Sequence, residues 1–224
     1  MVATLAEIGF SIRDQVKGFF SVDDERIDIE LVYKKIRDVR SVLIKNQLLE
    51  RRMLDPALYQ EICCLEIKCK EEVCNGKKTG VLEYYVDLPK IENTAGFNYS
   101  IKYFGSIDKL TAFNHKSFQG YQYGAASPYT GDKPFYTIIG STAIIKNLPT
   151  TAAKYMCLVA ILEDPLNGAC YMATENDPYP LSNSMVHELE LIVIKQLLSV
   201  LPVQPDERND ATDNPQGNNI ARKT

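Results

Sequence analysis

The apolar residues of this 224-residue chain change their spacing near the pair Asp55-Pro56. Before this pair they recur every third or fourth residue, which is the period of an amphipathic helix. In residues 63–69 apolar and charged side chains begin to alternate, which is the period of a half-buried strand. A proline also disfavours helical backbone at the residue before it. The chain is therefore predicted to fold as a helical segment followed by a β segment.

Three helices are predicted from apolar stripes. The first covers residues 3–18, and the second begins at an N-cap supplied by Ser21 or Asp23. The short link between them favours an antiparallel helical hairpin within residues 1–54. The third helix occupies residues 181–201 and is capped by Ser182 or Ser184. The stripes consist of Leu5, Ile8, Ile12 and Val16, of Ile27, Leu31, Ile36, Val39, Leu43 and Leu48, and of Met185, Leu189, Ile192, Leu197 and Leu201.

Residues 55–180 have the pattern of a block of mostly antiparallel strands, punctuated by turn signals such as Asn75-Gly76 and Gly140-Ser141. Regular alternation fades in residues 106–134, where glycine, serine and aromatic residues predict a long loop. The predicted fold class is α+β: an N-terminal helical hairpin and a C-terminal helix packed together, with a sandwich-like antiparallel β block between them. Residues 202–224 are polar, which predicts a tail that is disordered or bound to a partner.

Four of the six cysteines lie within residues 61–74, at Cys63, Cys64, Cys69 and Cys74. Their spacing does not give the two C-x2-C pairs of a zinc site. The N-terminal residues lack the basic region of a signal peptide, which predicts synthesis in a reducing cytoplasm, where disulfides are uncommon. We therefore expect Cys63 and Cys69 to be buried free thiols in one apolar row of a strand. A metal site and redox or disulfide chemistry are the alternatives.

No catalytic, cofactor-binding or metal-binding residue is predicted. The sequence contains no G-x-S-x-G, H-E-x-x-H, P-loop or G-x-G-x-x-G motif, and His115 in the long loop has no motif around it. A formal net charge of −4 provides no excess of cations for gripping nucleic acid. No apolar run reaches the length of a membrane helix, so no membrane partner is expected. These features favour a protein that contacts other proteins.

The aromatic loop and the polar tail are the candidate contact surfaces. Aromatic side chains interleaved with glycine and serine are typical of adaptable interfaces. The candidate interface residues are Phe113, Phe118, Tyr121, Tyr123 and Tyr129 in the loop, and Val203, Arg208, Ile220 and Arg222 in the tail.

The order of several motifs resembles that of structural proteins from crAss-like phages, which are short-tailed phages. A long helix with an acidic start contains "VRSVLIKNQLLERR" and leads into "YQEICCLEI". The later motifs are "GSIDKLTAF", "KPFYTIIGSTAIIKN", "AILEDP" and "YPLSNSMVHELELIVIKQLL". The resemblance lies in the order of these motifs and covers roughly residues 20–201, so it leaves out the first helix and the tail.

The resemblance is to the tail-vertex ring or head-tail adaptor proteins, which stack beneath the portal. It implies a virion protein, made in the host cytoplasm, that forms a ring in the neck, a dodecamer to match the portal, without catalysis or cofactor. Such a ring lines a channel in which DNA is only passing cargo, and it contacts the portal and adjacent ring or tail proteins. The alternatives are another structural component of the tail vertex, such as a hub or fibre anchor, and a cytoplasmic protein that binds metal through cysteines.

Overall fold

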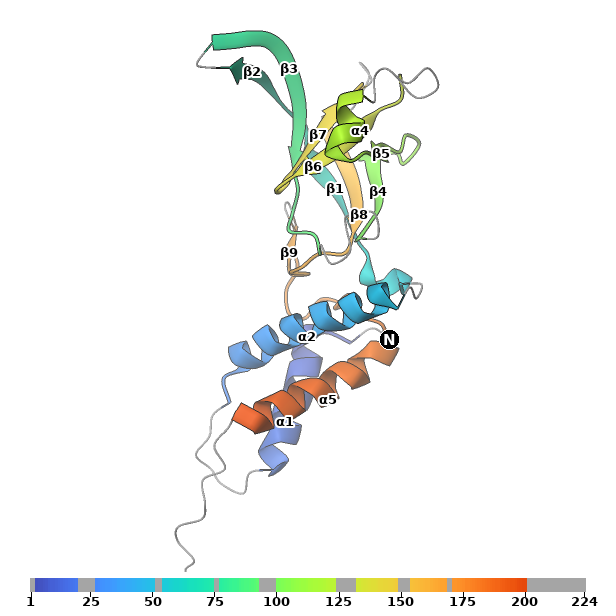
Figure 1. Cartoon of the computed structure of the whole chain (residues 1–224). Coiled ribbons are helices and arrows are strands. Elements are labelled where there is room, and N and C mark those ends of the chain that lie inside the picture. The colour runs from blue at the N-terminus through green and yellow to red at the C-terminus, as the bar shows by residue number, and fades with distance from the viewer. Residues whose placement is uncertain are drawn as a thin grey trace, which may run out of the picture.

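The computed structural model describes residues 3–19, 27–50, 54–74, 77–92, 100–123, 132–148, 154–168 and 171–200. Helices gather at one end of an elongated molecule and strands at the other (Figure 1). The helical part contains α1 (Leu5–Phe19), α2 (Ile29–Leu49) and α5 (Asn183–Val200), which all contact one another. Among the described helices, none combines the length and the apolar character needed to span a membrane.

Local sequence explains where α1 begins and which face it buries. The backbone N–H of Glu7 donates to the Thr4 hydroxyl at 3.1 Å, and the backbone N–H of Thr4 donates to the Glu7 carboxylate at 3.0 Å. These two bonds form a capping box, which satisfies N–H groups that the helix itself leaves free. The predicted stripe of α1 is confirmed, since all four of its residues are buried against α2 and α5.

The start of α2 differs from the prediction. Asp28 accepts a hydrogen bond from the Glu30 backbone N–H at 3.1 Å, while the predicted caps Ser21 and Asp23 lie outside the described residues. The prediction that Leu31 faces the core is wrong, because Leu31 is exposed and Val32 is fully buried. Val32 lies four residues before Ile36 and so shares its face, whereas a step of five turns a side chain away.

The three helices share one core with the segments that lead into and out of the β part. In α5 the stripe residues Met185, Leu189 and Leu197 are buried as predicted, and Leu201 lies outside the described residues. Leu58 from the short 3-10 helix η1 (Pro56–Leu58) and Ile161 after β8 also belong to this core.

The β part consists of two main sheets. The three-stranded sheet has the order β1 (Gln60–Glu66), β8 (Tyr155–Ala160) and β4 (Ile101–Ser106). The five-stranded sheet has the order β2 (Lys68–Cys74), β3 (Lys77–Asp87), β7 (Thr142–Lys146), β6 (Phe135–Ile139) and β5 (Asn114–His115). Pairing is antiparallel except between β5 and β6, and a small pair is formed by β9 (Asn167–Gly168) and β10 (Tyr171–Met172). The predicted α+β class is confirmed.

The two sheets enclose a second core. Phe104 of β4 lies 4.7 Å from Tyr136 of β6, measured between ring centroids, and so joins the sheets directly. Apolar residues from both sheets surround this contact, among them Ile62, Leu65, Val86, Ile145, Met156 and Leu158. The packing of sheet on sheet agrees with the sandwich-like arrangement expected from the alternating sequence.

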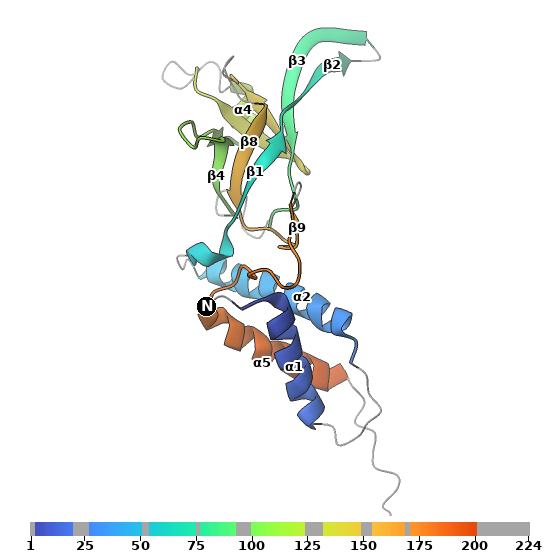
Figure 2. The same cartoon turned by 180° about the vertical axis from the view of Figure 1, so that it is seen from behind.

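The predicted strand over residues 63–69 is interrupted. β1 ends at Glu66 and β2 begins at Lys68, and the two belong to different sheets. The hairpin of β2 and β3 then projects beyond the rest of the β part (Figures 1 and 2). Cys69 is exposed on this hairpin, so its predicted place in a buried apolar row is wrong. The physical reason is that, in the part of the chain that the structure describes, no second sheet covers the projecting strands.

The segment predicted as a long loop, residues 106–134, contains regular structure in its described part. It includes β5 and α4 (Phe118–Tyr123). α4 lies on the outer face of the five-stranded sheet, where Tyr121 packs edge-on against Phe135 with 5.5 Å between ring centroids. The outer face of β6 is thus covered as well as its inner face.

A buried arginine joins the helical part to the β part. Arg40 of α2 is fully buried and donates to the backbone carbonyls of Leu162 at 2.8 Å and Pro180 at 3.3 Å. Its guanidinium carbon also lies 5.8 Å from the ring centroid of Tyr179. Burial lowers the pKa of Arg40. Because Leu162 follows β8 and Pro180 precedes α5, Arg40 connects α2 to both ends of the segment that returns from the sheets to the helices.

Candidate assembly surfaces

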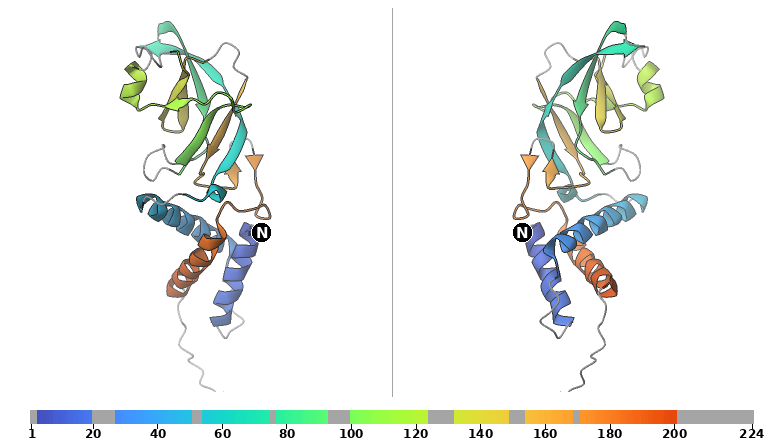
Figure 3. Two further views of the ribbon diagram at one scale, coloured as in Figure 1. Left: turned by 90° about the vertical axis from the view of Figure 1, so that its right-hand side faces the viewer. Right: turned by 90° about the vertical axis from the view of Figure 1, so that its left-hand side faces the viewer.

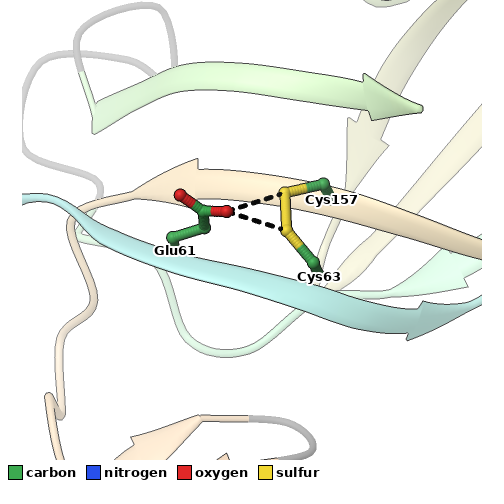
Figure 4. A group of neighbouring side chains, drawn as sticks. All are labelled: Glu61, Cys63 and Cys157. Atoms are coloured by element: carbon green, nitrogen blue, oxygen red, sulfur yellow. Dashed lines mark hydrogen bonds between the residues drawn. A yellow bond between two sulfur atoms is a disulfide. The ribbon is translucent and has the colours of Figure 1, made fainter. Parts of the chain in front are cut away.

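The cysteine cluster of the sequence is organised around a bulge in β1. Ile62 pairs with Leu158 and Leu65 pairs with Met156, so Cys63 and Cys64 together oppose Cys157. A bulge of this kind places two residues of one strand against one residue of its partner. Cys63 and Cys157 are joined by a disulfide, and the Glu61 carboxylate lies beside it (Figure 4).

The expectation of free thiols is therefore wrong for Cys63, which is bonded to Cys157 across two strands. Cys64 is also disulfide-bonded, and Cys69 is a free cysteine. The sequence pattern did not indicate this disulfide, because Cys157 is separated from Cys63 by 94 positions. Only the pairing of β1 with β8 brings the two together.

Glu61, Cys63 and Cys157 form the group of possible metal ligands among the described residues. One Glu61 oxygen lies 3.2 Å from the Cys63 sulfur and 3.9 Å from the Cys157 sulfur. In the disulfide neither sulfur carries a proton or a free thiolate, so neither can donate to the carboxylate or ligate zinc as cysteine does. If the bond were reduced, two thiols and one carboxylate would offer three ligands, one fewer than a structural zinc site uses. The arrangement acts as a cross-link between β1 and β8.

The predicted aromatic residues divide into two groups. Phe113 and Tyr121 are buried, the first between the two sheets and the second under α4. Phe118 and Tyr123, both on α4, are 56% and 74% exposed. The remaining candidates, Tyr129, Val203, Arg208, Ile220 and Arg222, lie outside the described residues. α4 thus brings two of the predicted contact residues to the surface.

The two histidines occupy different settings. His115 of β5 packs edge-on against Tyr136, with 5.3 Å between ring centroids, and burial lowers its pKa. His187 is exposed on α5.

Sequence reasoning missed a short loop that exposes two aliphatic side chains. It consists of residues 106–111, and we call it the 106–111 loop. It follows β4 and presents Ile107 and Leu110, which are 40% and 85% exposed. These two exposed aliphatic side chains make the loop a candidate contact surface. The signal in the sequence was the "SIDKLT" motif, in which the apolar residues are separated by charged ones.

Hydrogen bonds hold this loop in one shape. The Ser106 backbone N–H donates to the Thr111 carbonyl at 3.0 Å, and the Thr111 N–H donates to the Ser106 hydroxyl at 3.0 Å. The Tyr103 hydroxyl donates to the carbonyls of Ser106 at 2.9 Å and Thr111 at 3.1 Å. The Asp108 carboxylate accepts from the Ser106 hydroxyl and the Leu110 N–H, and these bonds lower the pKa of Asp108.

A hollow of about 260 Å³ lies near the turn between β6 and β7, and we call it the β6–β7 hollow. Its aliphatic lining comes from Leu88, Pro89, Ile91 and Ile138, and its charged lining from Lys90 and Glu163. This volume is smaller than that of a typical small-molecule pocket. It exceeds the roughly 150 Å³ cavity that accommodates benzene in an engineered protein. The hollow therefore has room for an aliphatic side chain.

Comparison with known proteins agrees with the resemblance drawn from the sequence. A family model described as CrAss_Ring_2, phage tail ring protein 2, matches residues 10–216. A search of curated proteins found no match. Since the matched region spans most of the chain, this protein belongs to the family of phage tail ring protein 2.

Proposed function

We propose that this protein forms a closed ring of identical subunits in the head-tail connector, beneath the portal, and that the ring lines the channel through which DNA passes. The family assignment is the observation that carries this proposal, because it identifies a structural ring component of a phage tail. We expect the ring to be a dodecamer, which would match the symmetry of a portal.

The shape of the subunit supports a place within a stack of rings. The helical part and the β part lie at opposite ends of the molecule (Figure 3). A subunit built in this way can contact its neighbours in the ring through its sides while each end meets a different layer. The projecting hairpin of β2 and β3, with Leu82 exposed on β3, adds a surface that reaches beyond the subunit's own core.

The charge of the chain suits a channel wall better than a nucleic-acid clamp. A net charge of −4 per subunit repels the DNA backbone weakly over the ring as a whole. Tight binding would require clusters of Lys and Arg that neutralise phosphates. We therefore infer that DNA is cargo that slides past and is not a bound ligand.

We also infer a structural role for this protein and not a catalytic one. Among the described residues, the 106–111 loop and α4 present exposed aliphatic and aromatic side chains, namely Ile107, Leu110, Phe118 and Tyr123. Aromatic side chains are enriched where proteins contact one another.

The proposal is tested by electron microscopy and native mass spectrometry of the purified chain, alone and mixed with portal protein. The expected result is a closed ring that stacks coaxially on the portal. A ring found elsewhere at the tail vertex would favour a hub or fibre anchor. A chain that stayed monomeric with the portal present, and that was missing from virions, would refute the proposal.

A further inference from the structure

The 106–111 loop has the properties of a preformed knob. Its backbone is held by the hydrogen bonds of Ser106, Thr111 and Tyr103, so little freedom remains to be lost on binding. Gly105 makes this closure possible, because a side chain there would lie 2.1 Å from the Thr111 carbonyl oxygen. The loop exposes two aliphatic residues, Ile107 and Leu110, on either side of the charged pair Asp108 and Lys109. A loop that is already ordered can place an exposed leucine in a partner's pocket at a small entropic cost.

The β6–β7 hollow lies on the other side of the β part. In Figure 1 the turn between β6 and β7 is at the left edge of the sheets, and the loop that follows β4 is at the right edge. A knob and a hollow on opposite sides of one chain cannot meet within that chain. They can meet between copies arranged head to tail, and such contacts form a ring when the rotation between copies closes.

Each of the two features carries one acidic and one basic residue, so two ion pairs can form between them. The knob carries Asp108 and Lys109 between its apolar residues, and the hollow is flanked by Lys90 and Glu163. Lys90 and Glu163 form no ion pair with each other or with any other described residue of their own subunit. Lys109 pairs with Glu61 at 2.7 Å, but both side chains are about half exposed. Such surface pairs contribute little, so Lys109 is available for a new partner.

We propose that the 106–111 loop of one subunit inserts Leu110 and Ile107 into the β6–β7 hollow of the next subunit. Lys109 then faces Glu163 of that neighbour, and Asp108 faces its Lys90. This inference rests on the ring proposed above and identifies the contact at the centre of its subunit interface. The remainder of the interface surrounds this contact and excludes water from it.

The test uses the full chain and three variants, with assembly followed by sedimentation velocity over a range of concentrations. Leu110→Asp places a charge at the tip of the knob. Ser141→Trp blocks the hollow from its exposed rim without altering the core. Leu191→Asp makes the same leucine-to-aspartate change on the exposed surface of α5 and serves as the control.

Leu110→Asp and Ser141→Trp are each expected to weaken association by at least about tenfold, because an aliphatic anchor is lost from its pocket. Leu191→Asp should assemble as the wild type does. An equal mixture of the two defective variants should form a dimer and grow no further, since only one intact knob and one intact hollow can pair. In a separate variant, Lys109→Glu should weaken assembly and the added change Glu163→Lys should restore it.

Rings of undiminished stability with Leu110→Asp would overturn the inference while leaving the ring itself in place. So would equal loss of assembly in the Leu191→Asp control, or failure of the two defective variants to pair. A wild-type chain that formed no ring under any condition would remove both this inference and the proposed function. Circular dichroism of every variant checks that the fold is retained.

Discussion

Replacing Arg40 should destabilise the junction between the helical part and the β part, and so lower the free energy of unfolding. The guanidinium donates to two backbone carbonyls, those of Leu162 and Pro180, and is fully buried. Hydrogen bonds to a charged group contribute about 1.5–3 kcal/mol each. Part of that gain offsets the cost of removing the charge from water. Arg40→Ala removes the buried charge, leaves two buried carbonyls without a donor and opens a cavity, so we expect the free energy of unfolding to fall by about 2–5 kcal/mol.

Arg40→Met distinguishes the hydrogen bonds from the packing. Methionine fills much of the same space and removes the buried charge, but it leaves both carbonyls without their donor. An unpaired buried carbonyl costs about 1–3 kcal/mol, partly offset because no charge has to be desolvated. The loss for Arg40→Met should therefore be smaller than the loss for Arg40→Ala.

The assay is urea denaturation followed by circular dichroism, with Arg37→Ala as the matched control. Arg37 lies one turn earlier on α2 and pairs with Asp164 at 3.2 Å, with both side chains about one third exposed. A pair as exposed as this contributes up to about 1 kcal/mol. The reasoning fails if Arg40→Ala destabilises the protein no more than Arg37→Ala does.

Three further predictions concern the cross-link, the buried tyrosine and the loop glycine. The Cys63–Cys157 disulfide closes a loop of 94 residues, so Cys63→Ser should lower the free energy of unfolding by up to about 4.7 kcal/mol. Reductant also breaks the disulfide of Cys64, so its effect in denaturant titrations should be at least as large, whereas Cys69→Ser should have little effect. Equal effects of Cys63→Ser and Cys69→Ser would contradict the assignment. Burial raises the pKa of Tyr179 to about 12, so its contribution to stability is fully present below about pH 10 and is lost as pH rises through 12. Its hydroxyl has no hydrogen-bond partner among the described residues, so Tyr179→Phe should leave stability at neutral pH unchanged or raised and should flatten this alkaline loss, as thermal melts at several pH values would reveal. Gly105→Ala should break the closure of the 106–111 loop, which hydrogen exchange of the Ser106 and Thr111 amides would detect, and unchanged protection would contradict the predicted clash.

The helices were the part of the fold most readily predicted from sequence. The stripe of Leu5, Ile8, Ile12 and Val16 identifies a buried helix face because a helix places residues three and four apart on one side, whatever lies against it. The alternation that begins near residue 63 identified a β segment for the same local reason. The α+β class followed from these two periods, and the family resemblance followed from the order of the motifs.

Some features of the candidate surfaces were within reach of the sequence and others were not. The exposed aromatics of α4, Phe118 and Tyr123, were predicted as contact residues, although the burial of Phe113 and Tyr121 was not foreseen. Whether an aromatic side chain covers a sheet or faces solvent depends on which sheet passes beneath it. The pattern of the aromatic segment itself does not contain that information.

The sequence by itself determined the periodic elements and their order, because each follows from contacts within a few residues along the chain. The tertiary structure alone decided the pairing of Cys63 with Cys157, the burial of Arg40 and the exposure of Leu110. Each of these depends on segments far apart in the chain. A bulge in β1 shifts which cysteine meets β8, and the returning segment supplies two carbonyls that accept hydrogen bonds from the buried arginine. The hydrogen bonds that close the 106–111 loop leave Leu110 exposed to solvent.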